Sequence, residues 1–113
     1  MGPHQQCRSG ENHRPLRPSA HGDRDTLARL EDVPNIVAVK ESAPDPRRFT
    51  DLYNRFGDRY TLMAGLDDVA LEGLMLGASG WVSGLTSAFP RESVALLAAQ
   101  RRGDYAEALR IYR

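Results

Sequence analysis

The sequence predicts an α/β fold in which parallel strands alternate with helices. Three observations carry this prediction: short β-branched or aromatic apolar runs, helical apolar periodicity between those runs, and glycines at the boundaries. In chain order the pattern is strand, helix, strand, helix, strand, helix, helix, which is typical of βαβ units in a parallel sheet. Three strands leave two unpaired apolar edges, so the segment is expected to belong to something larger.

Residues 1–22 are expected to be a disordered or misassigned start. They carry prolines, glycines and charges, with Leu16 as the one large aliphatic side chain after Met1. The potential ligands there have a spacing that matches no zinc pattern, so no metal site is expected; they are His4, Cys7, His13 and His21. The ordered domain is expected to cover residues 23–113.

The first part of that domain predicts a short helix and a strand. Asp25 can cap a helix that carries Leu27 and Leu30. Residues 36–39 form a continuous β-branched run, which is typical of a strand buried on both faces of a parallel sheet.

The next helix is predicted to start at Asp45-Pro46, because aspartate caps helices and proline fits their first turn. Gly57 is expected to end it. Residues 60–64 then predict a second buried strand. The helix carries an apolar stripe at steps of three and four residues: Phe49, Leu52, Tyr53 and Phe56.

A turn with an aspartate cap at residues 65–68 leads into a helix that ends at Gly77 and presents Leu71, Leu74 and Met75. Residues 80–83 predict a third strand, and residues 84–90 a loop that forms part of a pocket wall. A helix from Pro90 to near Gly103 is expected to bury Val94, Leu97 and Ala98. Asp104 and Glu107 form a box-like cap for a last helix that carries Ala108, Leu109 and Tyr112.

Composition limits the function classes. The 113 residues allow one domain, and 15 basic residues balance 15 acidic ones, so neither nucleic acid nor an anionic membrane is indicated as a partner. No apolar run approaches the roughly 20 residues of a spanning helix, and the start lacks the apolar core of a signal peptide. The single cysteine, Cys7, allows no internal disulfide, which fits the reducing cytoplasm.

Lys40 is the only lysine in the chain, and it ends the apolar run of the first strand. Arginine cannot act as an amine nucleophile, whereas a desolvated lysine can attack a carbonyl carbon and form a Schiff base. Alternation puts Lys40 on one strand face with Ile36 and Ala38, which in a closed parallel barrel is the inward face. The alternative is a strand-end lysine paired with Glu41 or an acidic neighbour, and spacing alone favours such an ion pair.

Two further segments could contribute to a site. After the second strand, Gly65 could let a substrate approach the backbone, and Asp67 and Asp68 could bind hydroxyls. The alternative is a turn glycine followed by a capping aspartate, which accounts for Asp68 better than for Asp67. The glycines around the third strand could form a phosphate-binding loop, although Gly77 is explained as a helix stop and no nucleotide motif is present.

Three motifs in order resemble one known family. Residues 35–42 read Asn-Ile-Val-Ala-Val-Lys-Glu-Ser, residues 64–68 read Ala-Gly-Leu-Asp-Asp, and residues 77–83 read Gly-Ala-Ser-Gly-Trp-Val-Ser. This pattern resembles the dihydrodipicolinate synthase and N-acetylneuraminate lyase family, whose members are class I aldolases and lyases on a (β/α)8 barrel. The resemblance covers residues 25–113.

The resemblance implies a role for each motif. Lys40 matches the family's sixth-strand lysine, which forms a Schiff base with pyruvate or a related 2-oxo acid without any cofactor. Gly65 matches the glycine that lines the substrate site, and Val82 matches the aliphatic residue whose backbone faces pyruvate. Asp67 and Asp68 match residues that contact substrate hydroxyls in the sialic-acid lyase branch. Homo-oligomers are common in the family.

The resemblance also implies that the chain holds only part of such an enzyme. A (β/α)8 barrel needs about 250 residues, so these residues would form approximately strands six to eight with the C-terminal helices. The position expected for the family's proton-shuttling tyrosine falls on Asn12, and the Gly-Gly-Thr-Thr-type loop that grips the substrate carboxylate is not found.

The function expected is therefore that of a lyase or aldolase, in a truncated chain that is not expected to be active alone. A non-enzymatic gene fragment and an association module are the alternatives. Dihydrodipicolinate synthesis, sugar-acid cleavage and hydroxyproline-pathway deamination all stay open as reactions.

Overall fold

The computed structural model describes residues 24–113, which are built around a three-stranded parallel sheet. The strands β1 (Ala38–Glu41), β2 (Thr61–Ala64) and β3 (Gly80–Trp81) lie side by side in chain order. Both strand pairs are parallel, which confirms the predicted sheet. The expectations for residues 1–22, including the four potential metal ligands, lie outside the described residues.

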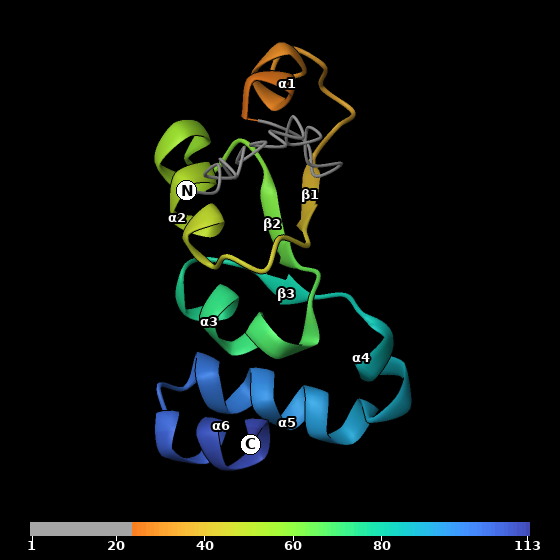
Figure 1. The fold of residues 1–113 in the computed structure, drawn as a ribbon, viewed down its shortest axis with the longest axis vertical. Helices are drawn as coiled ribbons and strands as arrows, with labels where there is room; N and C mark the ends of the chain where they lie inside the picture. The colour runs from red at the N-terminus through yellow and green to blue at the C-terminus, as the bar shows by residue number, and fades with distance from the viewer. Residues whose placement is uncertain (1–23) are drawn as a thin grey trace, which may run out of the picture.

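Helices precede, separate and follow the strands (Figure 1). The arrow of β1 points away from α1, toward the half of the chain where α5 and α6 lie against one another. The helical elements are α1 (Arg24–Arg29), α2 (Arg47–Phe56), the 3-10 turn η1 (Asp67–Val69), α3 (Ala70–Met75), α4 (Gly84–Ala88), α5 (Pro90–Arg101) and α6 (Tyr105–Tyr112).

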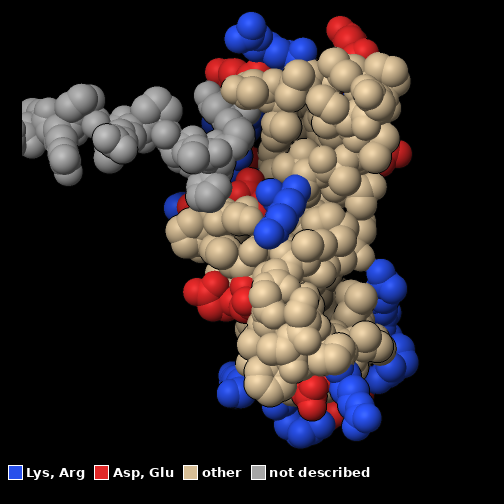
Figure 2. Space-filling model, turned by 90° about the vertical axis from the view of Figure 1, so that its right-hand side faces the viewer, with Lys and Arg blue, Asp and Glu red and all other residues tan. Residues whose placement is uncertain are grey.

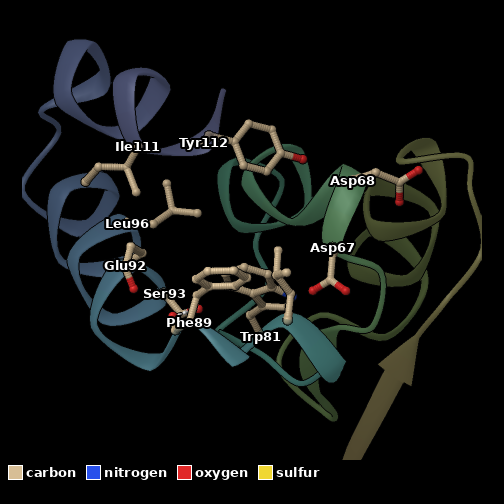
Figure 3. A pocket seen from close by; sticks show the side chains of 10 residues that line it. Asp67, Asp68, Trp81, Phe89, Glu92, Ser93, Leu96, Ile111 and Tyr112 are labelled. Atoms are coloured by element: carbon tan, nitrogen blue, oxygen red, sulfur yellow. Dashed lines mark hydrogen bonds between the residues drawn. The ribbon is translucent and has the colours of Figure 1, made fainter. Parts of the chain in front are cut away.

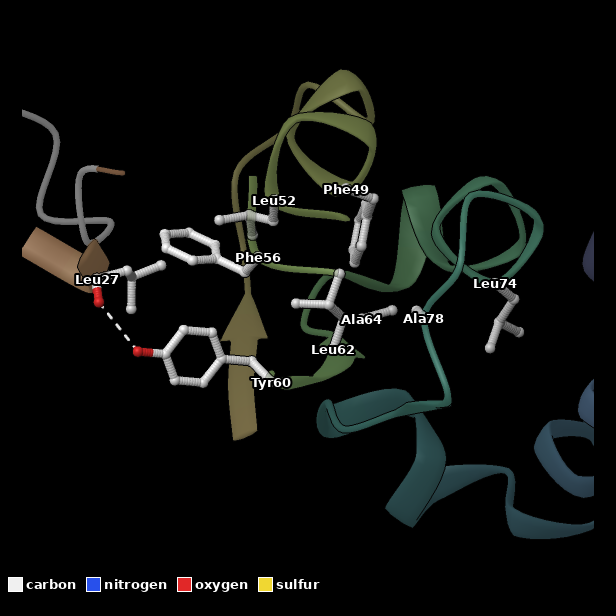
Figure 4. Packing of buried hydrophobic residues seen from close by; sticks show 9 residues of the cluster. All are labelled: Leu27, Phe49, Leu52, Phe56, Tyr60, Leu62, Ala64, Leu74 and Ala78. Atoms are coloured by element: carbon white, nitrogen blue, oxygen red, sulfur yellow. Dashed lines mark hydrogen bonds between the residues drawn. The ribbon is translucent and has the colours of Figure 1, made fainter. Parts of the chain in front are cut away.

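Helix α2 covers one face of the sheet. Asp45 Oδ1 accepts a hydrogen bond from the Arg47 backbone N–H at 3.0 Å and so caps the first turn, as predicted. Gly57 ends the helix with φ of 56°, a conformation that favours glycine. The buried side chains of α2 pack with those of β2 and with Leu27 and Tyr60 in one apolar cluster (Figure 4); the α2 members are Phe49, Leu52 and Phe56.

The opposite face of the sheet is open. Lys40 pairs in register with Met63, and Met63 with Gly80, so these three residues form one row across that face. Ala38, Lys40 and Thr61 are exposed there. The surface seen in Figure 2 is mostly tan, with charged side chains at both ends and a basic group near its middle. The described residues therefore form one helical layer on a sheet whose second face has no protein cover.

This open face corrects the prediction of a first strand buried on both sides. The strand begins at Ala38 instead of Ile36, and Val37 is 61% exposed. Within residues 24–113, α2 and α3 pack on one face of the sheet only.

A second apolar cluster joins α3, α5 and α6 through Leu71, Leu96, Ala99 and Ala108. The predicted apolar face of α5 was wrong at Val94, which is 67% exposed, and missed Leu96 and Ala99, which are buried. Leu97 is partly buried and packs against the first cluster. Apolar residues surround most of this helix, so periodicity alone does not select a face. The predicted cap of α6 is half formed: Asp104 Oδ1 accepts from the Glu107 N–H at 3.1 Å. The Glu107 carboxylate accepts from Arg110 instead of reaching back, and the Asp104 N–H donates to the Ala99 carbonyl.

Two local predictions also differ from the structure. Residues 84–88 form the short helix α4 where a loop was expected. Asp68 does not cap a helix: η1 begins without a side-chain cap, and α3 follows from Val69. Tyr53, Met75 and Leu109 were predicted to lie on the apolar faces of their helices, and this is wrong. Their side chains are at least 39% exposed on the outer surfaces of α2, α3 and α6.

Arg59 fixes the segment between α1 and β1. Its guanidinium donates to the carbonyl oxygens of Glu31, Val33 and Ile36 at 2.8, 2.8 and 2.9 Å. It also lies 4.5 Å from the centre of the Tyr60 ring. This arrangement needs the planar fork of arginine.

Arg59→Lys is therefore expected to lower the free energy of unfolding by about 1–3 kcal/mol, because carbonyl oxygens lose charged donors. Urea denaturation followed by circular dichroism measures this. Arg29→Lys on the exposed surface of α1 is the control and should change little; equal losses in the two variants would contradict the role of Arg59.

Candidate functional site

Lys40 and Gly65 meet at the carboxyl ends of β1 and β2. A β-carbon added to Gly65 would lie 2.9 Å from Lys40 Cε and 2.8 Å from the Glu41 carbonyl oxygen. The Gly65 N–H donates to that same oxygen at 2.8 Å. The absence of a side chain at Gly65 is thus what lets the lysine chain lie over the backbone.

The ion pair between Lys40 and Glu41 that spacing favoured is wrong. The two side chains leave opposite faces of β1, because neighbouring residues in a strand alternate. Glu41 is 4% exposed, and its carboxylate accepts from Arg48 Nε at 3.3 Å and from the Ala43 N–H at 2.7 Å. Among residues 24–113, Lys40 has no carboxylate partner within 4 Å.

Ser42 is a site neighbour that the sequence analysis did not select. Its Oγ comes so close to Gly65 that a β-carbon at position 65 would overlap it. Lys40 and Ser42 therefore converge on one point above the Gly65 backbone. The signal was present in the spacing, since residues 40 and 42 alternate to the same side of an extended chain.

Val82 lies just after β3, where its N–H donates to the Ala64 carbonyl at 2.8 Å. Its side chain is 47% exposed. Nearby, Met63 lies over Gly80, where a β-carbon would come within 2.7 Å of Met63 Cε. Beside Lys40, the open face therefore consists of the Met63 side chain lying over Gly80.

Asp67 and Asp68 border a separate pocket between the strand ends and the C-terminal helices (Figure 3). The cavity volume is about 570 Å³, and Trp81, Phe89, Leu96 and Ile111 give it apolar walls. Asp67 accepts a hydrogen bond from the Ser83 hydroxyl, which joins the loops after β2 and β3. Lys40, Gly65 and Val82 do not line this pocket, so the five predicted site residues fall into two groups.

Two polar groups stand out on the pocket wall. Trp81 Nε1 is buried and has no hydrogen-bond partner among residues 24–113. The Tyr112 hydroxyl donates to Glu72 Oε2 at 2.9 Å, which ties α6 to α3. Burial, followed by the hydrogen bond to Glu72 and the charge of that carboxylate, raises the pKa of Tyr112 from 10.0 to about 12.

This shift predicts a loss of stability in alkali. A raised pKa means that the folded chain favours the protonated phenol, so the contribution is complete below pH 10 and is lost as pH rises toward 12. The free energy of unfolding of the wild type should therefore fall toward that of Tyr112→Phe over this range. Tyr105→Phe, at a 49% exposed tyrosine, is the control. A constant difference between wild type and Tyr112→Phe from pH 9 to 11 would contradict the assignment.

Over residues 24–113, no group of three histidine, cysteine, aspartate or glutamate side chains is placed to hold a metal ion. No helix in that range is both long and apolar enough to cross a membrane.

Comparison with known proteins shows the family. The model of the dihydrodipicolinate synthetase family matches residues 13–113. A 4-hydroxy-tetrahydrodipicolinate synthase of Aquifex aeolicus is 35% identical over 89 residues, which are 78% of this chain and 30% of that protein. A probable 5-dehydro-4-deoxyglucarate dehydratase of Saccharopolyspora erythraea is 42% identical over 89 residues, covering 75% of this chain and 29% of that protein.

Solved structures agree. The crystal structure of dihydrodipicolinate synthase from Aquifex aeolicus superposes with a TM-score of 0.72, covering 78% of this chain and 30% of that one. A dihydrodipicolinate synthase from Acinetobacter baumannii, solved in complex with pyruvate, is 28% identical with a TM-score of 0.70 and covers 78% and 30% of the two chains.

The described residues thus form a partial TIM-barrel-like α/β fold of the kind on which these lyases are built. The chain belongs to the dihydrodipicolinate synthetase family. It spans about 30% of the length of the relatives named above.

Proposed function

We propose that this chain carries the Schiff-base lysine of a lyase or aldolase, and that Lys40 is that lysine. One observation carries the proposal: the only lysine of the chain lies against Gly65 on the open face of a parallel sheet, at the carboxyl end of its strand. Barrel enzymes keep their chemistry at this end of the strands. Membership of the family supports the same role.

The proposed substrate is pyruvate or a related 2-oxo acid. The Lys40 amine adds to the carbonyl carbon, and the carbinolamine loses water to give an imine. The protonated imine withdraws electrons, so a proton leaves the adjacent carbon and an enamine forms. The enamine carbon then adds to an aldehyde, or the reverse steps cleave the same carbon–carbon bond.

The remaining site residues receive complementary roles. Gly65 leaves room for the substrate beside Lys40, and Ser42 offers a hydroxyl on the same side. The backbone at Val82 would face the bound 2-oxo acid from the next strand. Asp67 and Asp68 would contact hydroxyls of a longer substrate, from the pocket that they border.

Residues 24–113 supply three strands of the proposed barrel. We assign the three strands to positions six to eight of a (β/α)8 barrel, with α5 and α6 among the C-terminal helices. The other strands of such a barrel would cover the open face that holds Ala38, Lys40 and Thr61. The intact protein is proposed to be a homo-oligomer. It is proposed to lie in the cytoplasm, because its single cysteine fits a reducing compartment.

Exchange of the pyruvate methyl protons for deuterium tests the chemistry, because enamine formation removes a proton from that carbon. Proton NMR of pyruvate in D2O should show loss of the methyl signal faster with the chain than in buffer. An exchange rate equal to that in buffer, in a sample whose thermal unfolding is cooperative, would refute the proposed activity of the chain.

An association module is the second candidate, favoured by the open face and by Val37, which is 61% exposed. In that case the chain would pair its strand edges with other barrel strands and bind no 2-oxo acid itself. Size-exclusion chromatography with light scattering separates the two candidates when combined with the exchange experiment. Association without exchange favours the module.

A further inference from the structure

The buried carboxylate of Glu41 raises a question that the proposed chemistry does not answer. Glu41 is 4% exposed and is the one buried charged side chain among residues 24–113. Burial of a carboxylate is costly unless it is paired and hydrogen-bonded. An apolar side chain at this position would be buried at a lower free-energy cost. The buried charge therefore indicates a functional reason for a carboxylate here.

Both carboxylate oxygens of Glu41 are held by the segment that follows it. Oε1 accepts from the Ala43 N–H at 2.7 Å, which fixes the turn out of β1. Oε2 accepts from Arg48 Nε at 3.3 Å, which ties the same turn to the first residues of α2. Charge-assisted bonds of this kind are stronger than neutral ones and are directional.

The backbone of Glu41 is held from the other side. Its carbonyl oxygen accepts from the Gly65 N–H at 2.8 Å. The residue is therefore fixed by α2 through its side chain and by the end of β2 through its main chain. Its two neighbours, Lys40 and Ser42, both reach the space above Gly65 on the opposite side of the chain.

We infer that Glu41 is a positioning residue that aims Lys40 and Ser42 at the same point over Gly65. It acts through its neighbours and touches no substrate. Because misplacement of a reacting group by about 1 Å can cost on the order of 100-fold in rate, a rigid anchor directly beside the nucleophile has a kinetic use. The expected effect on rate rests on the proposed Schiff-base role of Lys40. The effect of Glu41 on the positions of Lys40 and Ser42 does not depend on that role.

Variants of Glu41 separate the two bonds. Glu41→Gln keeps an acceptor for the Ala43 N–H and loses the charge, whereas Glu41→Leu keeps the approximate size and loses both bonds. Arg59→Lys is the stability control, because Arg59 bonds the segment before β1, at the opposite end of the strands from Gly65.

The first readout is NMR, which needs no substrate. A nuclear Overhauser effect between the Lys40 Hε protons and the Gly65 Hα protons is expected in the wild type, in Glu41→Gln and in Arg59→Lys, and should be lost or strongly weakened in folded Glu41→Leu. The single lysine makes its signals easy to assign. An unchanged effect in Glu41→Leu would overturn the inference, whatever the activity of the chain.

The second readout is the rate of methyl-proton exchange against pyruvate concentration. Glu41→Leu should lower the saturating rate about tenfold or more while changing the half-saturating pyruvate concentration less than about threefold. Glu41→Gln should recover most of that rate. Equal rate losses in Glu41→Leu and Arg59→Lys, per folded molecule, would mean that Glu41 acts on stability alone. Absence of exchange in the wild type would refute the proposed activity. The nuclear Overhauser effect between Lys40 and Gly65 would then decide the positioning role by itself.

Discussion

Replacing Lys40 by arginine is expected to lower pyruvate methyl exchange to the rate found in buffer, a loss of at least about 1000-fold if the wild-type rate allows it to be seen. Arginine keeps the positive charge and nearly the same length, but its guanidinium stays protonated and cannot form an imine. Stability should change little, because Lys40 is exposed on the open face. Proton NMR of pyruvate and a urea titration measure the two effects.

A lysine placed elsewhere is the matched control for this variant. Arg29→Lys on α1, combined with Lys40→Arg, restores a single exposed lysine to the chain without restoring one at Gly65. Exchange should stay at the buffer level in this double variant. Recovery of exchange would show that any accessible amine suffices and that the position of Lys40 carries no chemistry.

Gly65→Ala is expected to have the second largest effect. The added methyl group would overlap Ser42 Oγ, and it would lie 2.8 Å from the Glu41 carbonyl oxygen and 2.9 Å from Lys40 Cε. The Glu41 carbonyl oxygen belongs to the backbone and cannot move aside as a flexible side chain can, so the end of the strand must shift. A loss of about 1–3 kcal/mol in the free energy of unfolding is expected for such overpacking.

The same change should lower the exchange rate by about 10- to 100-fold, because it displaces the lysine chain from its place over the backbone. Gly84→Ala is the matched control, since a β-carbon at the start of α4 would have no atom within 4 Å. It should be neutral or slightly stabilising. A Gly65→Ala chain as stable and as active as Gly84→Ala would contradict the close approach.

Local patterns predicted the strand–helix order because each element carries its own signals. The α2 helix is an example: an aspartate-proline start, a stripe of Phe49, Leu52 and Phe56, and a glycine end all lie within residues 45–57. The parallel order of β1, β2 and β3 followed from the helices between them.

What failed depended on contacts from distant segments. The face of α5 is chosen by α3 and α6, whose apolar residues meet Leu96 instead of Val94. The apolar run at residues 36–39 correctly indicated a strand, but only one of its faces is covered by residues 24–113. Periodicity describes one element and cannot report which neighbour it meets.

The candidate site was predicted in the same uneven way. Strand alternation gave Lys40 its face, while spacing alone favoured the wrong partner, because Glu41 is adjacent in sequence and opposite in space. Ser42 was missed since a serine after a strand resembles any turn residue. The approach of the Lys40 and Ser42 side chains and the Glu41 carbonyl oxygen to Gly65 becomes visible only when two strands are placed in register.

Reductive trapping tests the central claim most directly. The chain is incubated with pyruvate and borohydride, digested, and mapped by mass spectrometry. The account predicts one reduced pyruvate adduct per chain on the peptide that contains Lys40, dependent on pyruvate and absent from Lys40→Arg. A folded wild-type chain that carries no adduct at Lys40, or carries it only at the amino terminus, would contradict the assignment of Lys40 as the Schiff-base lysine.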